Sequence, residues 1–279
     1  MEQFLTKTEL KERGWSEGEI KEFLGKPDQS YWDKTYKITI KLYDIKRVEL
    51  NENSSFFQHY RSRRSRGNPE ALKKWKAWKK KVDQIDAYNE LLTDKNHAIA
   101  WARKIIEEDN FIVLDTETTA LTPGCLLEIA AIDSQKNILI DTLLKPYFPI
   151  DEEARSVHGI SEKDCETAPT FLEISEQLRK IIEGRTLFTY NFDFDWFFLQ
   201  SECHHYEIPL FNPKDKDCLM FWYAQFIGEW HDYYQKYRWQ PLPGDHSALG
   251  DCYAAYDCLI EMAESEIKES LPLPITDQI

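Results

Sequence analysis

The stretch FIVLDTETTAL, residues 111–121, runs four apolar residues directly into two acids. The apolar run predicts a buried strand, and Asp115 and Glu117 stand at its end. Residues i and i+2 of an extended segment point to the same face, so the two carboxylates would converge on one spot. There they would repel each other and lose hydration unless a cation bridges them. The pair therefore either caps the strand where it meets water or gathers a positive ion.

Two further D-x-E pairs occur in the chain, so this spacing by itself does not identify a site. Asp151 with Glu153, and Asp164 with Glu166, lie in polar, loop-like sequence, where we expect solvated side chains. Only the pair at 115 and 117 follows an apolar run, which favours a binding role for that pair.

Two other stretches place acids near predicted helix starts. In NFDFDWFFL, residues 191–199, Asp193 and Asp195 are both candidates, and one of them could be only an N-cap. In HSALGD, residues 246–251, His246 stands five residues before Asp251, and no other of the seven histidines has an Asp at that spacing. We expect Asp251 on the first turns of the last helix and His246 in the preceding loop, where a plain surface histidine is the simpler alternative.

In this order the three sites resemble a known family. D-x-E at a first strand, N-x-x-F-D opening a middle helix and H-x-A-x-x-D before the last helix are similar to the motifs of the DEDDh 3′→5′ exonucleases. These are the DnaQ-like family of polymerase proofreading subunits, within the ribonuclease H-like fold. The resemblance spans residues 108–267. It implies removal of 5′-mononucleotides, one at a time, from the 3′ end of a nucleic acid, with DNA favoured over RNA.

The resemblance also implies roles for individual residues. His246 becomes the general base and Asp193 only a neighbour of the metal site. Four acids become ligands of two Mg²⁺ ions, with Mn²⁺ as a substitute: Asp115, Glu117, Asp195 and Asp251. The implied pocket for the terminal nucleotide consists of Thr118, Leu121, Val157, His158 and Phe194.

Two positions depart from the family pattern. The family usually has Gly where this chain has Ala120, and His where it has Tyr190. Neither position is a metal ligand, so we expect the departures to change the fit of the terminal nucleotide and not the metal site.

The expected chemistry accounts for the acids. A phosphodiester resists attack because its own negative charge repels nucleophiles. Two divalent ions about 4 Å apart lower that barrier, since one activates the attacking water and the other stabilises the leaving oxygen. Hard oxygen ligands suit Mg²⁺ or Mn²⁺, and a histidine can take a proton from water near neutral pH.

The composition indicates a folded protein of one large or two modest domains. The chain has 279 residues, of which 42% are hydrophobic, which excludes wholesale disorder. No run approaches the roughly 20 apolar residues of a membrane helix. The start, MEQFLTKTELKERGW, is too charged for a signal peptide, and six cysteines without a CxxC pair fit reduced thiols. We therefore expect a cytoplasmic protein without membrane contact.

The charge divides the chain into two halves. Residues 1–100 carry 21 Lys and Arg against 16 acids, whereas residues 101–279 carry 14 against 33. This asymmetry predicts an N-terminal module over 1–100 and an exonuclease domain over 101–279. In the second half, apolar strand-like runs alternate with helical stretches at 168–183, 194–204 and 248–267, which predicts an α/β fold with a mixed sheet flanked by helices.

The N-terminal module begins with two S/T-x-x-E capping boxes, Thr6 with Glu9 and Ser16 with Glu19. A strand pattern follows in TYKITIKL, residues 35–42. Two capped helices and a strand resemble a helix-turn-helix with a wing, a shape used on nucleic acid. A small packing or protein-interaction module explains the pattern equally well. The expected apolar side comprises Leu10, Trp15, Ile20, Phe23 and Leu24.

A basic run follows at residues 59–81, with ten Lys and Arg and one acid. Part of it predicts a helix whose tryptophans are core and whose lysines face elsewhere. Such a run is either a solvated face or a phosphate-binding surface, and its excess charge favours phosphate. The candidate contacts are Arg61, Arg63, Arg64, Arg66, Lys73 and Lys74.

These observations predict a nuclease whose partner is a nucleic acid with a free 3′ end, single-stranded, and whose N-terminal module binds nucleic acid or protein. The opposite interpretation is an inert nucleic-acid-binding protein, but all five expected catalytic residue types are present. DNA and RNA are not separated, because no feature reads the 2′-hydroxyl.

Overall fold

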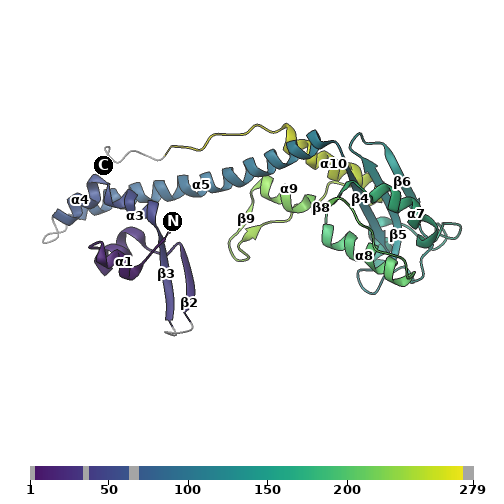
Figure 1. Ribbon diagram of the computed structural model, residues 1–279, viewed down its shortest axis with the longest axis horizontal. Helices are drawn as coiled ribbons and strands as arrows, with labels where there is room; N and C mark the ends of the chain where they lie inside the picture. Colours follow the sequence, from purple (N-terminus) through teal and green to yellow (C-terminus); the bar gives the residue numbers. More distant parts are fainter. Residues whose placement is uncertain (1–3, 34–37, 63–68, 273–279) are drawn as a thin grey trace. The chain divides into compact units, whose positions relative to one another are not determined.

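The computed structural model describes residues 4–33, 38–62 and 69–272 (Figure 1). Contacts between Cα atoms divide the chain into two units, Met1–Ala87 with Leu271–Ile279, and Tyr88–Ser270. Helix α5 (Pro69–Glu108) begins in the first unit and ends in the second, so it runs through the boundary expected at residue 100. Among the described residues, no helix is both long enough and apolar enough to span a bilayer.

The first unit packs short helices against a three-stranded antiparallel sheet of order β1-β3-β2. Both predicted capping boxes form, because the Thr6 and Ser16 hydroxyls accept hydrogen bonds from the backbone N–H of Glu9 and Glu19. The five expected apolar residues are buried together with Tyr43, Val48 and Phe57. The elements are β1 (Phe4–Thr6), α1 (Lys7–Glu12), α2 (Glu17–Glu19), the π-helical turn η1 (Ile20–Leu24), β2 (Gln29–Asp33), β3 (Ile38–Asp44), α3 (Ile45–Glu52) and α4 (Ser55–Ser62).

The second unit is built on a mixed five-stranded sheet, as predicted, of order β6-β5-β4-β7-β8. Strands β4, β5 and β6 pair antiparallel, whereas β4, β7 and β8 run parallel. The strands are β4 (Phe111–Thr118), β5 (Leu126–Asp133), β6 (Ile138–Leu143), β7 (Thr186–Thr189) and β8 (Asp215–Cys218), with a separate hairpin of β9 (Trp230–His231) and β10 (Lys236–Tyr237). The helices are α6 (Glu152–His158), α7 (Phe171–Ile182), α8 (Phe192–His205), α9 (Leu219–Ile227) and α10 (Ala248–Glu264).

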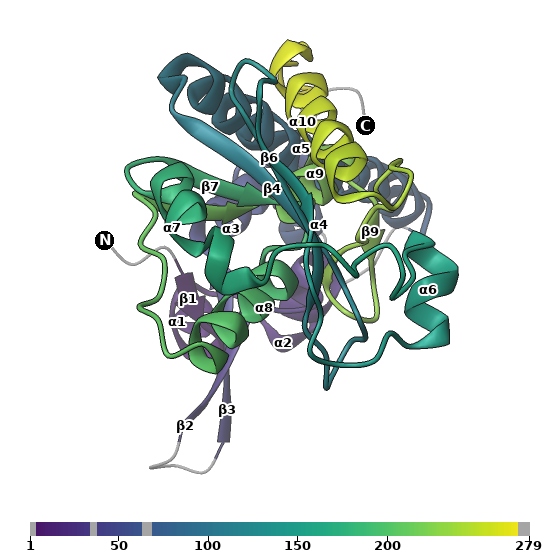
Figure 2. The same cartoon turned by 90° about the vertical axis from the view of Figure 1, so that its right-hand side faces the viewer.

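Strand β4 is buried on both faces because helices cover the sheet on both sides. Its residues Phe111 and Val113 pack into a core with α10, α9 and the end of α5. Ile112 and Leu114 point the other way, into a core with α7 and α8. Figure 2 shows α10 and α7 on opposite sides of the sheet. A strand buried on both sides reads as a continuous apolar run, which is what residues 111–114 show.

Candidate active site

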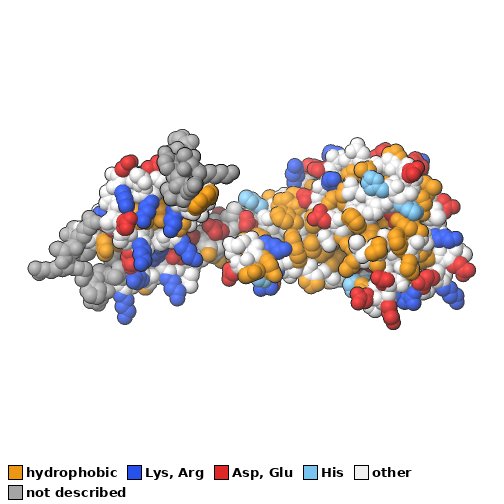
Figure 3. Space-filling model, turned by 90° about the horizontal axis from the view of Figure 1, so that it is seen from below, with side chains coloured by type: hydrophobic (Ala, Val, Ile, Leu, Met, Phe, Trp, Pro, Cys, Tyr) orange, Lys and Arg blue, Asp and Glu red, His pale blue; other side chains and the backbone are white. Residues whose placement is uncertain are grey.

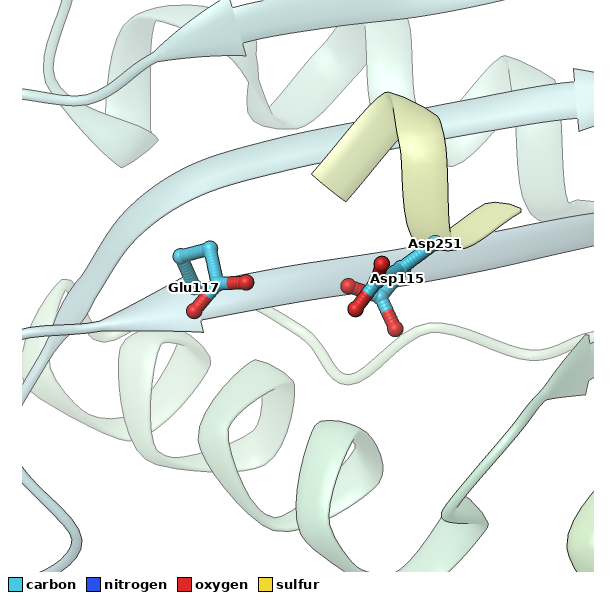
Figure 4. Close-up of side chains that lie close together, drawn as sticks. All are labelled: Asp115, Glu117 and Asp251. Atoms are coloured by element: carbon cyan, nitrogen blue, oxygen red, sulfur yellow. The ribbon is translucent and has the colours of Figure 1, made fainter. Parts of the chain in front are cut away.

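Three carboxylates meet where β4 ends and α10 begins. Asp115, Glu117 and Asp251 each offer an oxygen, and these oxygens all lie within 4.8 Å of one another. Figure 4 shows Asp115 and Glu117 on the strand and Asp251 reaching Asp115 from the start of α10. The arrangement therefore confirms that the two acids of the D-x-E pair point to one spot, and it adds the acid expected on the last helix.

The alternation of β4 explains this convergence. Phe111 and Val113 face the core that contains α10, and Asp115 and Glu117 continue the same row of the strand. The helix dipole also favours this meeting, because Asp251 lies in the first turn of α10, where the backbone N–H groups are positive.

The electrostatics of the cluster favour a bound cation. Burial, followed by the negative charges of Asp195, Asp251 and Glu117, raises the pKa of Asp115 well above its usual value. Burial and then repulsion from Asp251 raise the pKa of Glu117 to about 8. Burial also raises the pKa of Asp251. Acids crowded in this way ionise readily only beside a cation, and hard carboxylate oxygens suit a divalent metal ion.

Asp195 approaches the cluster from the other face of the sheet. It lies in the first turn of α8, it is buried, and its carboxylate accepts a hydrogen bond of 2.7 Å from the Thr116 hydroxyl. Thr116 stands between the two acids of the pair and points to the opposite face, toward α8. Burial raises the pKa of Asp195 to about 7, against the lowering effect of the Thr116 hydrogen bond. Asp193, two residues earlier, is exposed.

The loop before α10 wraps around Asp251. The His246 backbone N–H donates to the Asp251 carboxylate at 3.3 Å, and the Ser247 hydroxyl caps the helix at Gly250. Gly244 approaches so closely that a Cβ atom there would lie 1.7 Å from an Asp251 oxygen. His246 has a left-handed backbone, φ 61°, and an exposed side chain. Such a backbone conformation at a non-glycine residue is common at functional sites.

Glu128 is a site residue that the sequence reasoning missed. It lies on β5 directly opposite Glu117, and its carboxylate accepts a hydrogen bond of 2.8 Å from the backbone N–H of Ala248, the first residue of α10. Glu128 therefore ties the sheet to the helix that carries Asp251. The signal was visible in the sequence, because Glu128 is the single acid inside the apolar run LLEIAAI.

The five residues expected around a terminal nucleotide differ in exposure. Leu121 and Val157 are exposed apolar side chains, 78% and 53% accessible. Thr118 is buried and donates to the Ala120 carbonyl, and Phe194 packs against Phe198 in the core. His158 accepts a hydrogen bond at Nδ1 from the Ile160 N–H.

The Nε2 atom of His158 is buried and makes no well-aligned hydrogen bond within the described part of the chain, although the Thr118 backbone lies beside the imidazole. Burial lowers the pKa of this imidazole. A polar atom left in this state can take up a hydrogen bond when a ligand binds. The two positions that depart from the family pattern, Ala120 and Tyr190, are both buried, and the hydroxyl of Tyr190 donates to the Gln240 carbonyl at 2.8 Å.

The basic residues of the first unit have mixed surroundings. Arg61 forms an ion pair with buried Glu19, donates to the Gly14 carbonyl and stacks over Phe57. Lys73 and Lys74 are exposed on α5. The remaining three candidates, Arg63, Arg64 and Arg66, lie outside the described residues.

Comparison with known proteins places the second unit in a family. The Exonuclease family, RNase_T, matches residues 112–259, which contain all five expected catalytic residues. An uncharacterized exonuclease of Escherichia phage 186 is 31% identical over 169 residues, 54% of this chain and 86% of its own length. The DNA polymerase III subunit epsilon-like protein of Rhodobacter capsulatus is 28% identical over 177 residues, 58% of this chain but 25% of that protein.

Among solved structures, Exonuclease X in complex with 5′ overhanging duplex DNA aligns with a TM-score of 0.39 and 22% identity, over 57% of this chain and 95% of that one. The chain spans less than half the length of the DNA polymerase III epsilon subunits it matches, for example 42% of the Escherichia coli subunit. Because the family match extends over more than half of the residues and contains the acidic cluster, the chain belongs to the DEDDh, DnaQ-like exonuclease family of hydrolases, with a ribonuclease H-like fold.

Proposed function

We propose that this protein is a metal-dependent 3′→5′ exonuclease that shortens single-stranded nucleic acid, DNA in preference to RNA, from its free 3′ end. The observation that supports this most directly is the convergence of Asp115, Glu117 and Asp251 within 4.8 Å. Carboxylates brought together against their own repulsion provide a site for divalent cations.

In this proposal two ions, Mg²⁺ or Mn²⁺, are held by the three converging acids together with Asp195. When bound, they supply positive charge that activates water and stabilises the leaving oxygen. The Thr116 hydroxyl fixes the Asp195 carboxylate, and the Gly244 backbone and the His246 N–H fix that of Asp251. These contacts hold the ligands in place before substrate arrives.

His246 serves as the general base, taking the proton of the attacking water at an imidazole nitrogen. Its left-handed backbone, its exposed ring and the hydrogen bond from its backbone N–H to Asp251 support this role. The exposed apolar side chains of Leu121 and Val157 suit contact with the terminal base and sugar, and the buried Nε2 of His158 suits a polar group of the nucleotide.

The strand must also be bound at points distant from the reacting phosphate, because residues 101–279 carry far more acids than bases and would repel it. We propose that the first unit contributes this contact, through its exposed lysines on α5 or through a protein partner bound to the unit. A protein partner would be consistent with the similarity of this chain to subunits of polymerases.

The test uses matched single-stranded DNA and RNA oligomers labelled at the 5′ end. With Mg²⁺ we expect the label to move down a ladder of strands shortened from the 3′ end, with release of 5′-mononucleotides, and chelator should stop the reaction. A strand whose 3′ end carries a phosphate is the control: it should be degraded more slowly if hydrolysis begins at a free 3′ hydroxyl. Faster loss of RNA would reassign the substrate, and binding without hydrolysis would show an inert nuclease domain.

The choice between the two acids of α8 is tested with matched variants. Asp195→Asn should abolish hydrolysis, whereas Asp193→Asn should retain it, because only Asp195 is buried beside the cluster. The reverse result would place the ligand at Asp193.

A further inference from the structure

The hairpin of β9 and β10 exposes large aromatic side chains. Its two-residue strands pair Trp230 with Tyr237 and His231 with Lys236. Trp230, Tyr233, Tyr234 and Trp239 are 42%, 83%, 62% and 46% accessible. Aromatic side chains gain free energy from burial, so their concentration on one short exposed hairpin indicates a surface that contacts a partner.

Tyr233, Tyr234 and Trp239 have ring contacts only within the hairpin segment, since Tyr234 packs against His231 and Tyr233, and Lys236 lies over Tyr234 and Trp239. Tyr237 anchors the hairpin, because its hydroxyl donates to the Asp94 carboxylate on α5, and Trp230 packs edge-on against Tyr237 at 5.2 Å. The Arg238 N–H closes the hairpin on the Glu229 carbonyl at 2.8 Å. Tyr233, Tyr234 and Trp239 remain for contact with a partner, and we refer to these three residues as the aromatic platform.

The chemistry of the platform fits single-stranded nucleic acid. The Lys236 ammonium lies 4.9 Å from the centre of the Trp239 ring and 5.9 Å from that of Tyr234. Rings interleaved with a cation are how proteins bind single strands, because bases stack on the rings and phosphates approach the cation. Figure 3, seen from the side toward which β9 points in Figure 1, shows hydrophobic and basic side chains together at the hairpin.

The hairpin is attached at the edge of the sheet where the acids converge. The chain leaving it is held by the hydrogen bond from the Tyr190 hydroxyl to the Gln240 carbonyl. Tyr190 directly follows β7, the parallel neighbour of β4, so it lies at the same carboxyl edge as Asp115 and Glu117. From Gln240 the chain reaches His246 after only six residues. The segment that leaves the hairpin therefore leads to the edge of the sheet where the acids converge, so a strand running along it from the hairpin would reach the acidic cluster.

We propose that Tyr233, Tyr234 and Trp239 stack the bases of a single strand whose 3′ end lies in the acidic cluster. This inference rests on the proposed exonuclease function and specifies its substrate, since paired bases of a duplex cannot reach the rings. The hairpin bears Lys236 and Arg238 against Glu229 and Asp232, so its charges balance. Stacking on the rings therefore contributes more to its affinity than the phosphate contact of Lys236 does.

The experiment measures binding by the full-length chain of a fluorescent single-stranded DNA of about twenty nucleotides, with Ca²⁺ in place of Mg²⁺ to suppress cleavage. Trp239→Ala and the double variant Tyr233→Ala/Tyr234→Ala should each weaken binding by roughly five- to hundredfold, the range for loss of one stacked base. The slope of log affinity against log salt should stay unchanged. Trp239→Phe and Tyr234→Phe should restore most of the affinity. Tyr88→Ala, which removes an exposed aromatic from α5, is the matched control and should bind like wild type.

A strand with abasic sites identifies stacking directly. Abasic positions keep the phosphates but remove the bases, so wild type should bind such a strand more weakly than the intact one. Trp239→Ala should bind the abasic strand almost as well as wild type does. Equal affinities of wild type and the alanine variants for the intact strand would overturn the proposal. The proposal would also be overturned if the alanine variants kept their affinity for the strand but lost self-association in sedimentation. That result would assign the platform to contact with a second copy of the chain. Binding is scored without cleavage, so failure of wild type to hydrolyse in Mg²⁺ would refute the exonuclease function separately.

Discussion

Replacing Glu117 by Gln should stabilise the metal-free protein while destroying its metal site. Burial, and then the negative charges of Asp251 and Glu128, raise the pKa of the half-buried Glu117 carboxyl from 4.5 to about 8. In the unfolded chain this group ionises near pH 4.5, but in the folded chain it holds its proton until pH 8. The stability that depends on this proton is complete below pH 4.5 and is lost as the pH rises toward 8.

The magnitude follows from the two pKa values. At pH 7 the unfolded carboxyl is ionised and the folded one is protonated, which sets an upper limit of about 3.4 kcal/mol on the free energy lost. Contact of Glu117 with solvent reduces this to about 1–2 kcal/mol. An uncharged glutamine does not lose this free energy of unfolding at pH 7, so Glu117→Gln should unfold about 2–8 °C higher than wild type for a unit of this size.

The assay is thermal unfolding of the full-length protein in chelator between pH 6 and pH 8.5. The gap between variant and wild type should widen as the pH rises. Glu166→Gln is the matched control, because Glu166 belongs to another D-x-E pair but is exposed, and it should unfold like wild type. Added Mn²⁺ should raise the unfolding temperature of wild type more than that of Glu117→Gln, since ligand binding stabilises the state that binds it. A Glu117→Gln protein that is less stable than wild type in chelator, at every pH, would refute the reasoning.

Three further outcomes are expected. His246→Ala should slow the chemical step by roughly 10²–10⁴-fold and leave Mn²⁺ binding, measured by calorimetry, nearly unchanged; wild-type turnover at neutral pH would place the base elsewhere. Glu128→Gln should retain the hydrogen bond to the Ala248 N–H and most of the activity, whereas Glu128→Ala should lower turnover by loosening the start of α10; equal turnover in the two variants would show that this contact is dispensable. Lys73→Ala/Lys74→Ala should flatten the slope of log affinity against log salt by about 0.7 for each true phosphate contact with a single strand; an unchanged slope would identify these lysines as a solvated face.

Local chemistry explains what could be predicted from the sequence alone. Both capping boxes of the first unit form, because a cap involves only residues three apart along the chain. The buried strand ending at Asp115 and the helix beginning before Asp251 follow from apolar runs and helical periodicity. The order of the acidic motifs identified the family, and the match over residues 112–259 confirms it.

Other elements escaped prediction because tertiary contacts create them. Strand β8 has the polar sequence DKDC and pairs only because β7 presents an open parallel edge. Strands β1 and β2 lack a period-two pattern and form through pairing with β3. The helix predicted from the basic run continues to Glu108, since its last turns pack Ala98, Ile99 and Ala102 into the core of the second unit.

The site itself shows the same division. The sequence supplied the residue types and placed Asp115 and Glu117 on one face of a strand, but its pattern left Asp193 and Asp195 both open, and only the resemblance to the family favoured Asp195. The packing of α8 makes that distinction, by burying Asp195 against Thr116 and leaving Asp193 in water. The role of Glu128 at the start of α10, and the exposure of the aromatic platform, likewise depend on which surfaces meet across the sheet. Patterns along the chain report the neighbours of a residue in sequence, whereas burial, pKa and convergence depend on neighbours that only folding brings together.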